Sequence, residues 1–204
     1  MANFNDKSKL TYNKKADNYD QTLDGIFTRK FKLQLVDYIE LDDGQNVLDV
    51  ACGNGTLLSM LKGKKPVNGY GVDIAERMIL NAVKDHPDIE FHVSGCESMP
   101  FQNESMDIVT VCAAYHHFPD VAAFAGEVWR LLKPRGKIYI ADVYLPTILR
   151  LIINPFVPFS RSGDVKFYSP KEIVGNFEQF GFRKVGTRIS GTIMIVSMEK
   201  RSLM

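Results

Sequence analysis

Two groups of residues in this sequence have side chains or backbone suited to chemistry. The first is a pair of adjacent imidazoles, His116 and His117, which follows an apolar run at residues 106–112. The second is the run 46–55, which holds two glycines. Imidazoles can act as general bases near neutral pH, whereas glycines let the backbone turn sharply and approach a ligand closely. The glycine run therefore predicts a nucleotide-like cofactor site, and the histidines are candidates for catalysis.

A strand, a turn and a helix must position the glycine run. Residues 47–50 are mostly apolar, as is typical of a parallel strand that is covered on both faces. Gly53 and Gly55 lie in the turn, and the helix that starts at Thr56 directs its free N–H groups toward the space above it. That space suits an anionic group such as a carboxylate or a phosphate.

An acidic residue at the end of the next strand indicates which kind of cofactor the site binds. A second strand is expected over residues 68–74, and Asp73 near its end is placed to accept hydrogen bonds from both hydroxyls of a ribose. The alternative is that Asp73 caps the following helix. Ile74 and Met78 would offer apolar surface to an adenine ring. Leu58 stands where a dinucleotide-binding loop has its third glycine, which disfavours a nicotinamide cofactor.

The run 49–55, Asp-Val-Ala-Cys-Gly-Asn-Gly, resembles motif I of the class I S-adenosylmethionine-dependent methyltransferases. In that family this loop holds the methionine end of the cofactor, and glycine is frequent at the position of Ala51. The loop 94–101 resembles the family's segment that borders the adenine, although Gly95 replaces a frequent Asp. The resemblance implies S-adenosyl-L-methionine as cofactor, with contacts from Tyr12, Tyr19, Asp49, Ala51, Cys52, Gly53, Gly55, Asp73, Ile74, Met78, Cys96, Glu97 and Ala113.

The N-terminal residues 1–41 are expected to form a helical lid region. Tyr12 and Tyr19 are seven residues apart, so both rings can lie on one helix face. Their segment resembles the element that folds over the cofactor in many of these methyltransferases; the alternative is a helix that merely anchors on the domain. A second helix over residues 26–41 should pack on the sheet.

The resemblance implies an α/β fold: a Rossmann-like, seven-stranded, mostly parallel sheet with one antiparallel strand, helices on both faces and a small apolar cap insertion. The patterns predict the remaining strands at residues 89–93, 106–112, 137–142, 182–188 and 192–198. The last two are close enough in sequence to form an antiparallel hairpin at the sheet edge. Asp120 is expected to cap a helix, and Ser169 to begin another with Pro170 and Glu172.

His116 and His117 follow the fourth strand, at the edge of the sheet where ligands bind in α/β folds. In the family the sulfonium of the cofactor already makes the methyl group electrophilic, so the protein mainly aligns a nucleophile. A base is needed when the acceptor atom is an oxygen or an activated carbon. Either histidine is a candidate for that base, and the alternative for each is that it braces its loop.

Residues 143–169 interrupt the alternation of strands and helices. They hold about ten large apolar residues between prolines, among them Tyr144, Ile148 and Phe156. Such a segment is too apolar to be disordered. We expect a short helical cap whose apolar face lines the acceptor pocket; the alternative is a dimer interface.

The composition limits which kinds of protein this chain can be. With 204 residues, 45% hydrophobic and 24% charged, the chain is expected to form one globular domain over 1–204. A net charge of +1 provides no long-range electrostatic attraction for nucleic acid. No signal peptide or membrane-inserting stretch is evident, and three cysteines lack metal-ligand spacing, so we expect a cytoplasmic protein without a metal, as a monomer or homodimer.

Three functions are compatible with these residues. The favoured one is methyl transfer from S-adenosylmethionine to a small, apolar or aromatic molecule. The alternative is a sensor that binds S-adenosylmethionine or S-adenosylhomocysteine without turnover. A nicotinamide-dependent oxidoreductase is disfavoured by Leu58.

Overall fold

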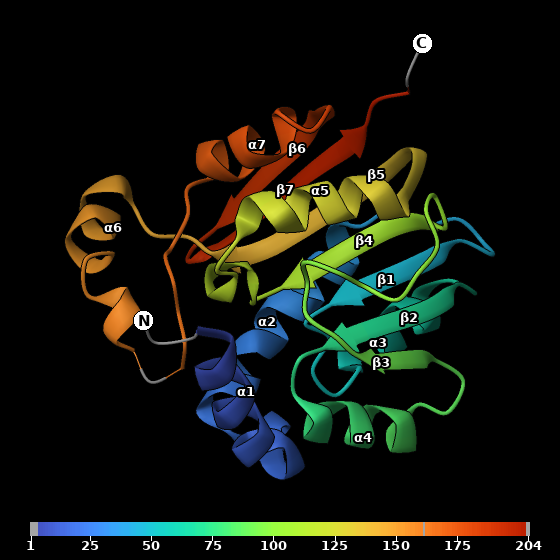
Figure 1. The fold of residues 1–204 in the computed structure, drawn as a ribbon, viewed down its shortest axis with the longest axis horizontal. Coiled ribbons are helices and arrows are strands. Elements are labelled where there is room, and N and C mark those ends of the chain that lie inside the picture. Colours follow the sequence, from blue (N-terminus) through green and yellow to red (C-terminus); the bar gives the residue numbers. More distant parts are fainter. Residues whose placement is uncertain (1–3, 161, 203–204) are drawn as a thin grey trace.

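A computed structural model describes residues 4–160 and 162–202 of the chain (Figure 1). Its centre is one seven-stranded sheet in the order β3-β2-β1-β4-β5-β7-β6, in which β7 runs antiparallel to both neighbours. The predicted mostly parallel sheet with one reversed strand is confirmed. The strands are β1 (Asn46–Val50), β2 (Asn68–Asp73), β3 (Glu90–Val93), β4 (Met106–Cys112), β5 (Leu132–Val143), β6 (Phe182–Ser190) and β7 (Ile193–Lys200).

The helices connect these strands and cover the sheet. Two predicted helix starts are confirmed: the Asp120 side chain accepts from the backbone N–H groups of Ala122 and Ala123, and Ser169 forms a capping box with Glu172. The helices are α1 (Phe4–Lys15), η1 (Ala16–Gln21), α2 (Leu23–Tyr38), α3 (Thr56–Lys64), α4 (Glu76–Asp85), η2 (Tyr115–His117), α5 (Val121–Leu131), α6 (Thr147–Ile153), η3 (Val157–Phe159) and α7 (Pro170–Glu178).

Strand β1 is buried on both faces, as its apolar sequence predicts. Leu48 belongs to the core cluster that contains Phe124 of α5, whereas Val47 belongs to the cluster that contains Leu35 of α2 and Leu58 of α3. Helices α5 and α7 therefore cover one face of the sheet and α2 and α3 the other (Figure 1).

The predicted boundaries of two elements, α2 and β5, were wrong by three residues or more. Helix α2 begins at Leu23 rather than at residue 26, because the side chain of Thr22 accepts a hydrogen bond from Gly25 N–H and caps the helix. It ends at Tyr38, before the predicted residue 41. Strand β5 begins at Leu132 and includes the predicted turn 133–136, which is accommodated by a left-handed Arg135 (φ 67°) and a register shift against β4.

The cap segment forms short helices, but most of its apolar side chains over residues 148–159 are exposed. Ile148 is 77% exposed and Phe156 70% exposed, and Leu149, Leu151, Ile152 and Phe159 are also exposed. The Asn154 side chain makes two hydrogen bonds with the backbone of Phe167, each 3.0 Å, so this polar residue turns inward instead. Our expectation that the apolar face lines the pocket was wrong for these side chains. The alternative, a dimer interface, stays a prediction.

No helix within residues 4–160 and 162–202 has both the length and the apolar character required to cross a bilayer.

Candidate active site

The loop after β1 forms a cradle. Ala51 and Gly53 both have left-handed backbones, with φ of 58° and 56°. A Cβ atom at Gly53 would meet nothing within 4 Å, so open space lies above this residue. Gly55 serves packing instead, because a Cβ there would lie 2.6 Å from the ring of Phe91. The sequence thus identified the loop, while Gly55 positions its helix rather than facing a ligand.

Asp73 holds this loop and the start of the next helix together. One carboxylate oxygen accepts from Gly53 N–H and the other from Ala75 N–H, both at 2.8 Å. Burial raises the pKa of Asp73, and the backbone N–H groups oppose that rise. The carboxylate therefore fixes the start of the helix, and it also borders the space above the loop.

A first cavity lies above this loop, and most of the predicted cofactor residues line it. These are Tyr12, Tyr19, Ala51, Cys52, Gly53, Asp73, Ile74, Met78, Cys96 and Ala113. Asp49, Gly55 and Glu97 do not line it. Asp49 is 2% exposed and accepts a 2.7 Å hydrogen bond from the Thr110 hydroxyl, and burial raises its pKa to about 7. Asp49 therefore lies beneath the loop instead of in the crevice.

Lys32 of α2 lines the same cavity and was not predicted from the sequence. Lys32 is 8% exposed, and its ammonium lies 6.0 Å from the centre of the Tyr19 ring. Of the described residues around this cavity, it is the single lysine or arginine. The signal was present in the sequence: Lys32 is one helical turn before the buried Leu35, on the apolar stripe of its helix.

The N-terminal helices cover the cavity. Tyr12 of α1 and Tyr19 of η1 contribute their rings, whose centroids are 6.1 Å apart, so the rings lie together although they come from two helices and not from one helix face as predicted. Polar contacts fasten this region to α4: Lys9 pairs with Glu76 at 2.5 Å, and Asp17 accepts two hydrogen bonds from Arg77, of 2.9 and 3.0 Å.

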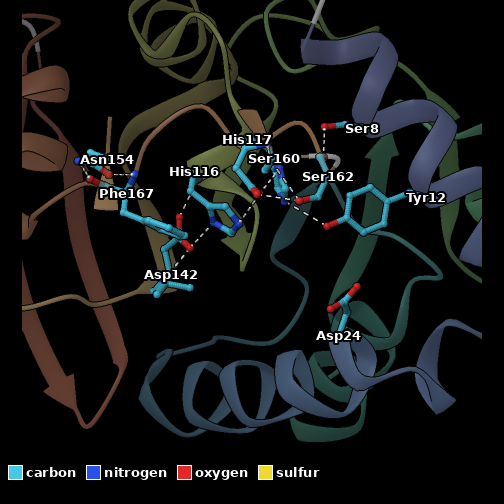
Figure 2. A network of polar contacts seen from close by, with 12 residues as sticks. Ser8, Tyr12, Asp24, His116, His117, Asp142, Asn154, Ser160, Ser162 and Phe167 are labelled. Atoms are coloured by element: carbon cyan, nitrogen blue, oxygen red, sulfur yellow. Dashed lines mark hydrogen bonds and ion pairs between the residues drawn. The ribbon is translucent and has the colours of Figure 1, made fainter. Parts of the chain in front are cut away.

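His116 and His117 have different surroundings (Figure 2). His116 is buried, and Asp142 accepts a 2.9 Å bond from its backbone N–H and contacts its Nδ1 at 2.6 Å. Although burial lowers the pKa of His116, the carboxylates of Asp142 and Asp164 raise it above the ordinary value. These contacts match the bracing role considered for this residue.

His117 lies at the boundary of two cavities. It lines the first cavity and also a second, which is bordered by Tyr12, Phe27, Val143, Asp164 and Phe167. Its Nε2 is 3.1 Å from the hydroxyl of Tyr12. Burial and the neighbouring His116 lower its pKa to about 4, so the imidazole is neutral at neutral pH.

The lining of the first cavity fits S-adenosylmethionine. The open cradle at Gly53 admits a ligand close to the backbone, and Lys32 can neutralise a carboxylate. The Asp73 carboxylate borders the space where a ribose would lie, and Ile74 and Met78 provide apolar surface for a planar base.

Comparison with known proteins agrees with this fit. The family described as "Methyltransferase domain" matches residues 48–140, which include the cradle, Asp73 and both histidines. Residues 48–140 thus match a methyltransferase domain, and the chain resembles the class I S-adenosylmethionine-dependent methyltransferases in sequence and fold. The cofactor of this family is S-adenosylmethionine.

The chain is similar to two proteins named demethylmenaquinone methyltransferase. The one from Chlorobaculum parvum is 33% identical over 108 residues, which cover 53% of this chain and 45% of that protein. The one from Thermotoga maritima is 29% identical over 175 residues, which cover 75% of this chain and 76% of that protein. The chain thus spans less than half of the Chlorobaculum protein.

Among solved structures, the chain shares its fold with a phosphoethanolamine N-methyltransferase of Haemonchus contortus in complex with S-adenosylmethionine. The TM-score is 0.71 at 14% identity, and the match covers 99% of this chain and 61% of the other.

Proposed function

We propose that this methyltransferase transfers the methyl group of S-adenosylmethionine to a small, apolar or aromatic acceptor that occupies the second cavity. The observation that supports this most directly is that both cavities are lined by Tyr12, Ala113 and His117. A cofactor above the β1 loop and an acceptor in the second cavity would meet at these residues. When bound, the cofactor supplies a methyl group on a cationic sulfur, which is a good electrophile.

The chain's own residues bind and orient the two reactants, and they exclude water from them. Lys32 pairs with the carboxylate of the cofactor, Asp73 accepts from its ribose hydroxyls, and Ile74 packs on its adenine. The helices that carry Tyr12 and Tyr19 shield the meeting point from solvent. Alignment of two bound reactants can supply about 7–11 kcal/mol of the barrier reduction.

The second cavity supports an acceptor with an apolar body. Phe27, Val143 and Phe167 contribute apolar surface, whereas His116, His117 and Asp164 form a polar group at one side. The relatives named demethylmenaquinone methyltransferase act, by that name, on a quinone precursor. An aromatic ring that carries an oxygen substituent combines both requirements.

The test is methyl transfer from cofactor labelled at its methyl group to a panel of quinols, phenols, aliphatic alcohols and amines. We expect labelled product and S-adenosylhomocysteine with aromatic hydroxyl acceptors. Lys32→Met should lose turnover at low cofactor concentration, while Lys30→Met, on the exposed side of the same helix, should not. Binding of both cofactor forms with no transfer to any acceptor would contradict the proposal and support the sensor alternative.

A further inference from the structure

Three side chains from two distant parts of the chain converge at the border of the second cavity. His116 Nε2 lies 3.6 Å from Asp164 Oδ1, and His117 Nδ1 lies 3.1 Å from the same oxygen. One potential ligand atom from each of the three residues lies within 4.8 Å of the other two. The sequence predicted no metal site, and it could not reveal this group because Asp164 comes from the cap segment.

These separations suit a metal ion. A divalent transition metal binds imidazole nitrogen and carboxylate oxygen at about 2.0–2.2 Å, which places neighbouring ligand atoms about 3.0–3.4 Å apart. The two distances to Asp164 Oδ1 lie at or near that range. Two histidines and one carboxylate are also a common ligand set for Zn²⁺ and Fe²⁺ sites with open coordination positions.

Each of the three residues contacts a further polar group; Figure 2 labels the partners of the two histidines, Asp142 and Tyr12. Asp142 contacts His116 Nδ1 at 2.6 Å, which directs the Nε2 lone pair toward Asp164. The Tyr12 hydroxyl contacts His117 Nε2 at 3.1 Å, and Asp164 Oδ2 accepts a 2.7 Å bond from the hydroxyl of Ser162. Metal-binding histidines are usually held in this way through the nitrogen that does not bind the metal.

One nitrogen in the group has no hydrogen-bond partner. His117 Nδ1 is buried and makes no hydrogen bond, although Asp164 Oδ1 is only 3.1 Å away. In the tautomer that carries the proton on Nε2, the lone pair of Nδ1 faces a carboxylate, which is unfavourable because neither atom donates. A cation between them would satisfy both.

We propose that His116, His117 and Asp164 bind one divalent first-row transition-metal ion. Its open positions face the second cavity, where they take an oxygen of the acceptor. This second role rests on the function proposed above, whereas the metal site does not. The rival explanation of the group is a protonated His116 that bridges Asp142 and Asp164 with no ion.

Metal binding is tested without cofactor or acceptor. Protein stripped of metal by a chelator is titrated with Zn²⁺ by calorimetry, and with Co²⁺ followed by visible absorption. We expect one ion per chain, and an affinity at least tenfold weaker in His117→Gln and Asp164→Asn. His92→Gln is the matched control, because His92 also faces a carboxylate, Glu90 at 2.6 Å, but lies outside the group.

Circular dichroism and thermal melting of the metal-free variants establish that they are folded. If a variant unfolds, the Co²⁺ spectrum of the wild type and its displacement by Zn²⁺ still report the site. Equal Zn²⁺ affinity in wild type and Asp164→Asn, or no bound ion at millimolar Zn²⁺, would overturn the site and leave the bridging imidazolium.

The role of the ion is tested separately with an acceptor identified by the transfer assay. Chelator treatment should lower turnover at least tenfold, added Zn²⁺ should restore it, and the affinity for S-adenosylhomocysteine should not change. Full turnover in metal-free protein would overturn the role of the ion but not methyl transfer. Tight Zn²⁺ binding without transfer under any condition would support the metal site and contradict the proposed function.

Discussion

At the scale of single residues, Lys32 on the buried side of α2 is our candidate for recognition of the cofactor carboxylate. Its ammonium lies in the first cavity, and the structure describes no other lysine or arginine on that cavity's wall. A buried ammonium is costly unless an anion pairs with it. The carboxylate of the cofactor would supply that anion, so ligand binding would relieve an unfavourable feature of the free protein.

We predict that Lys32→Met weakens binding of S-adenosylhomocysteine about ten- to a hundredfold, because a charge-assisted hydrogen bond contributes about 1.5–3 kcal/mol. Isothermal titration of wild type, Lys32→Met and the exposed control Lys30→Met measures this. An unchanged dissociation constant in Lys32→Met would show that the carboxylate of the ligand binds elsewhere.

Asp49 leads to a prediction about how the stability of the protein depends on pH. Burial raises its pKa to about 7, above the ordinary value near 3.8, so the folded state holds the proton more tightly than the unfolded chain. The stability that this residue contributes is full below pH 4 and is lost as the pH rises toward 7. We expect Asp49→Asn, whose amide oxygen can still accept from Thr110, to be more stable than wild type at pH 8, by up to about 4 kcal/mol.

Urea unfolding at pH 5 and pH 8 provides the test for Asp49. The gain in the free energy of unfolding should be larger at pH 8 than at pH 5. Parallel pH profiles of the two proteins would mean that Asp49 is ionised in the folded state throughout this range.

At the scale of elements, the N-terminal helices depend on α4 for their position over the first cavity. The ion pairs between them are exposed, and Arg77 forms one with Asp17 through two hydrogen bonds. Exposed pairs contribute only about 0.2–1 kcal/mol each. A buried apolar cluster of Ala16, Ala75 and Met78 also joins the cover to α4, so the pairs are the weaker part of this contact.

We predict that Arg77→Gln raises the dissociation rate of bound S-adenosylhomocysteine about two- to fivefold, with no change in thermal stability. Stopped-flow displacement measures the rate. Lys62→Gln, which removes another exposed pair with Asp88, serves as control. If both variants release ligand at the wild-type rate, the pairs do not control opening.

At the scale of the whole molecule, the apolar surface on α6 and η3 is separate from both cavities. Substituting Ile148, Phe156 and Phe159 together by serine should cost less than about 0.5 kcal/mol per site, because these side chains are already in water. Val157→Ala, in the same segment but only 6% exposed, should cost about 1–3 kcal/mol. Chemical unfolding measures both.

The triple serine variant also tests the cap. We expect it to leave the Michaelis constant for the acceptor unchanged. A raised value would show that these side chains reach the acceptor during turnover, as the sequence had suggested.

Local patterns predicted the parts of the site that depend on neighbours in sequence. The strand, glycine turn and helix at residues 46–64 need only short-range information, and Asp73 follows from its place at a strand end. The contact of His116 with Asp142 and the approach of Asp164 depend on how separate segments meet, so residue types alone could not reveal them. The sequence also could not predict which side of α6 packs on the protein, because that helix is apolar on nearly every side.

Strand β7 occupies an interior place in the sheet, between β5 and β6, and its residues from Ile193 to Lys200 are all buried. During synthesis this strand leaves the ribosome after both of its partners. Until it does, β5 presents an open apolar edge, and β6 has no neighbour on which to pair. A nascent chain that stalls before Ile193 would therefore be a substrate for chaperones, and completion of this last strand would commit the protein to its folded state.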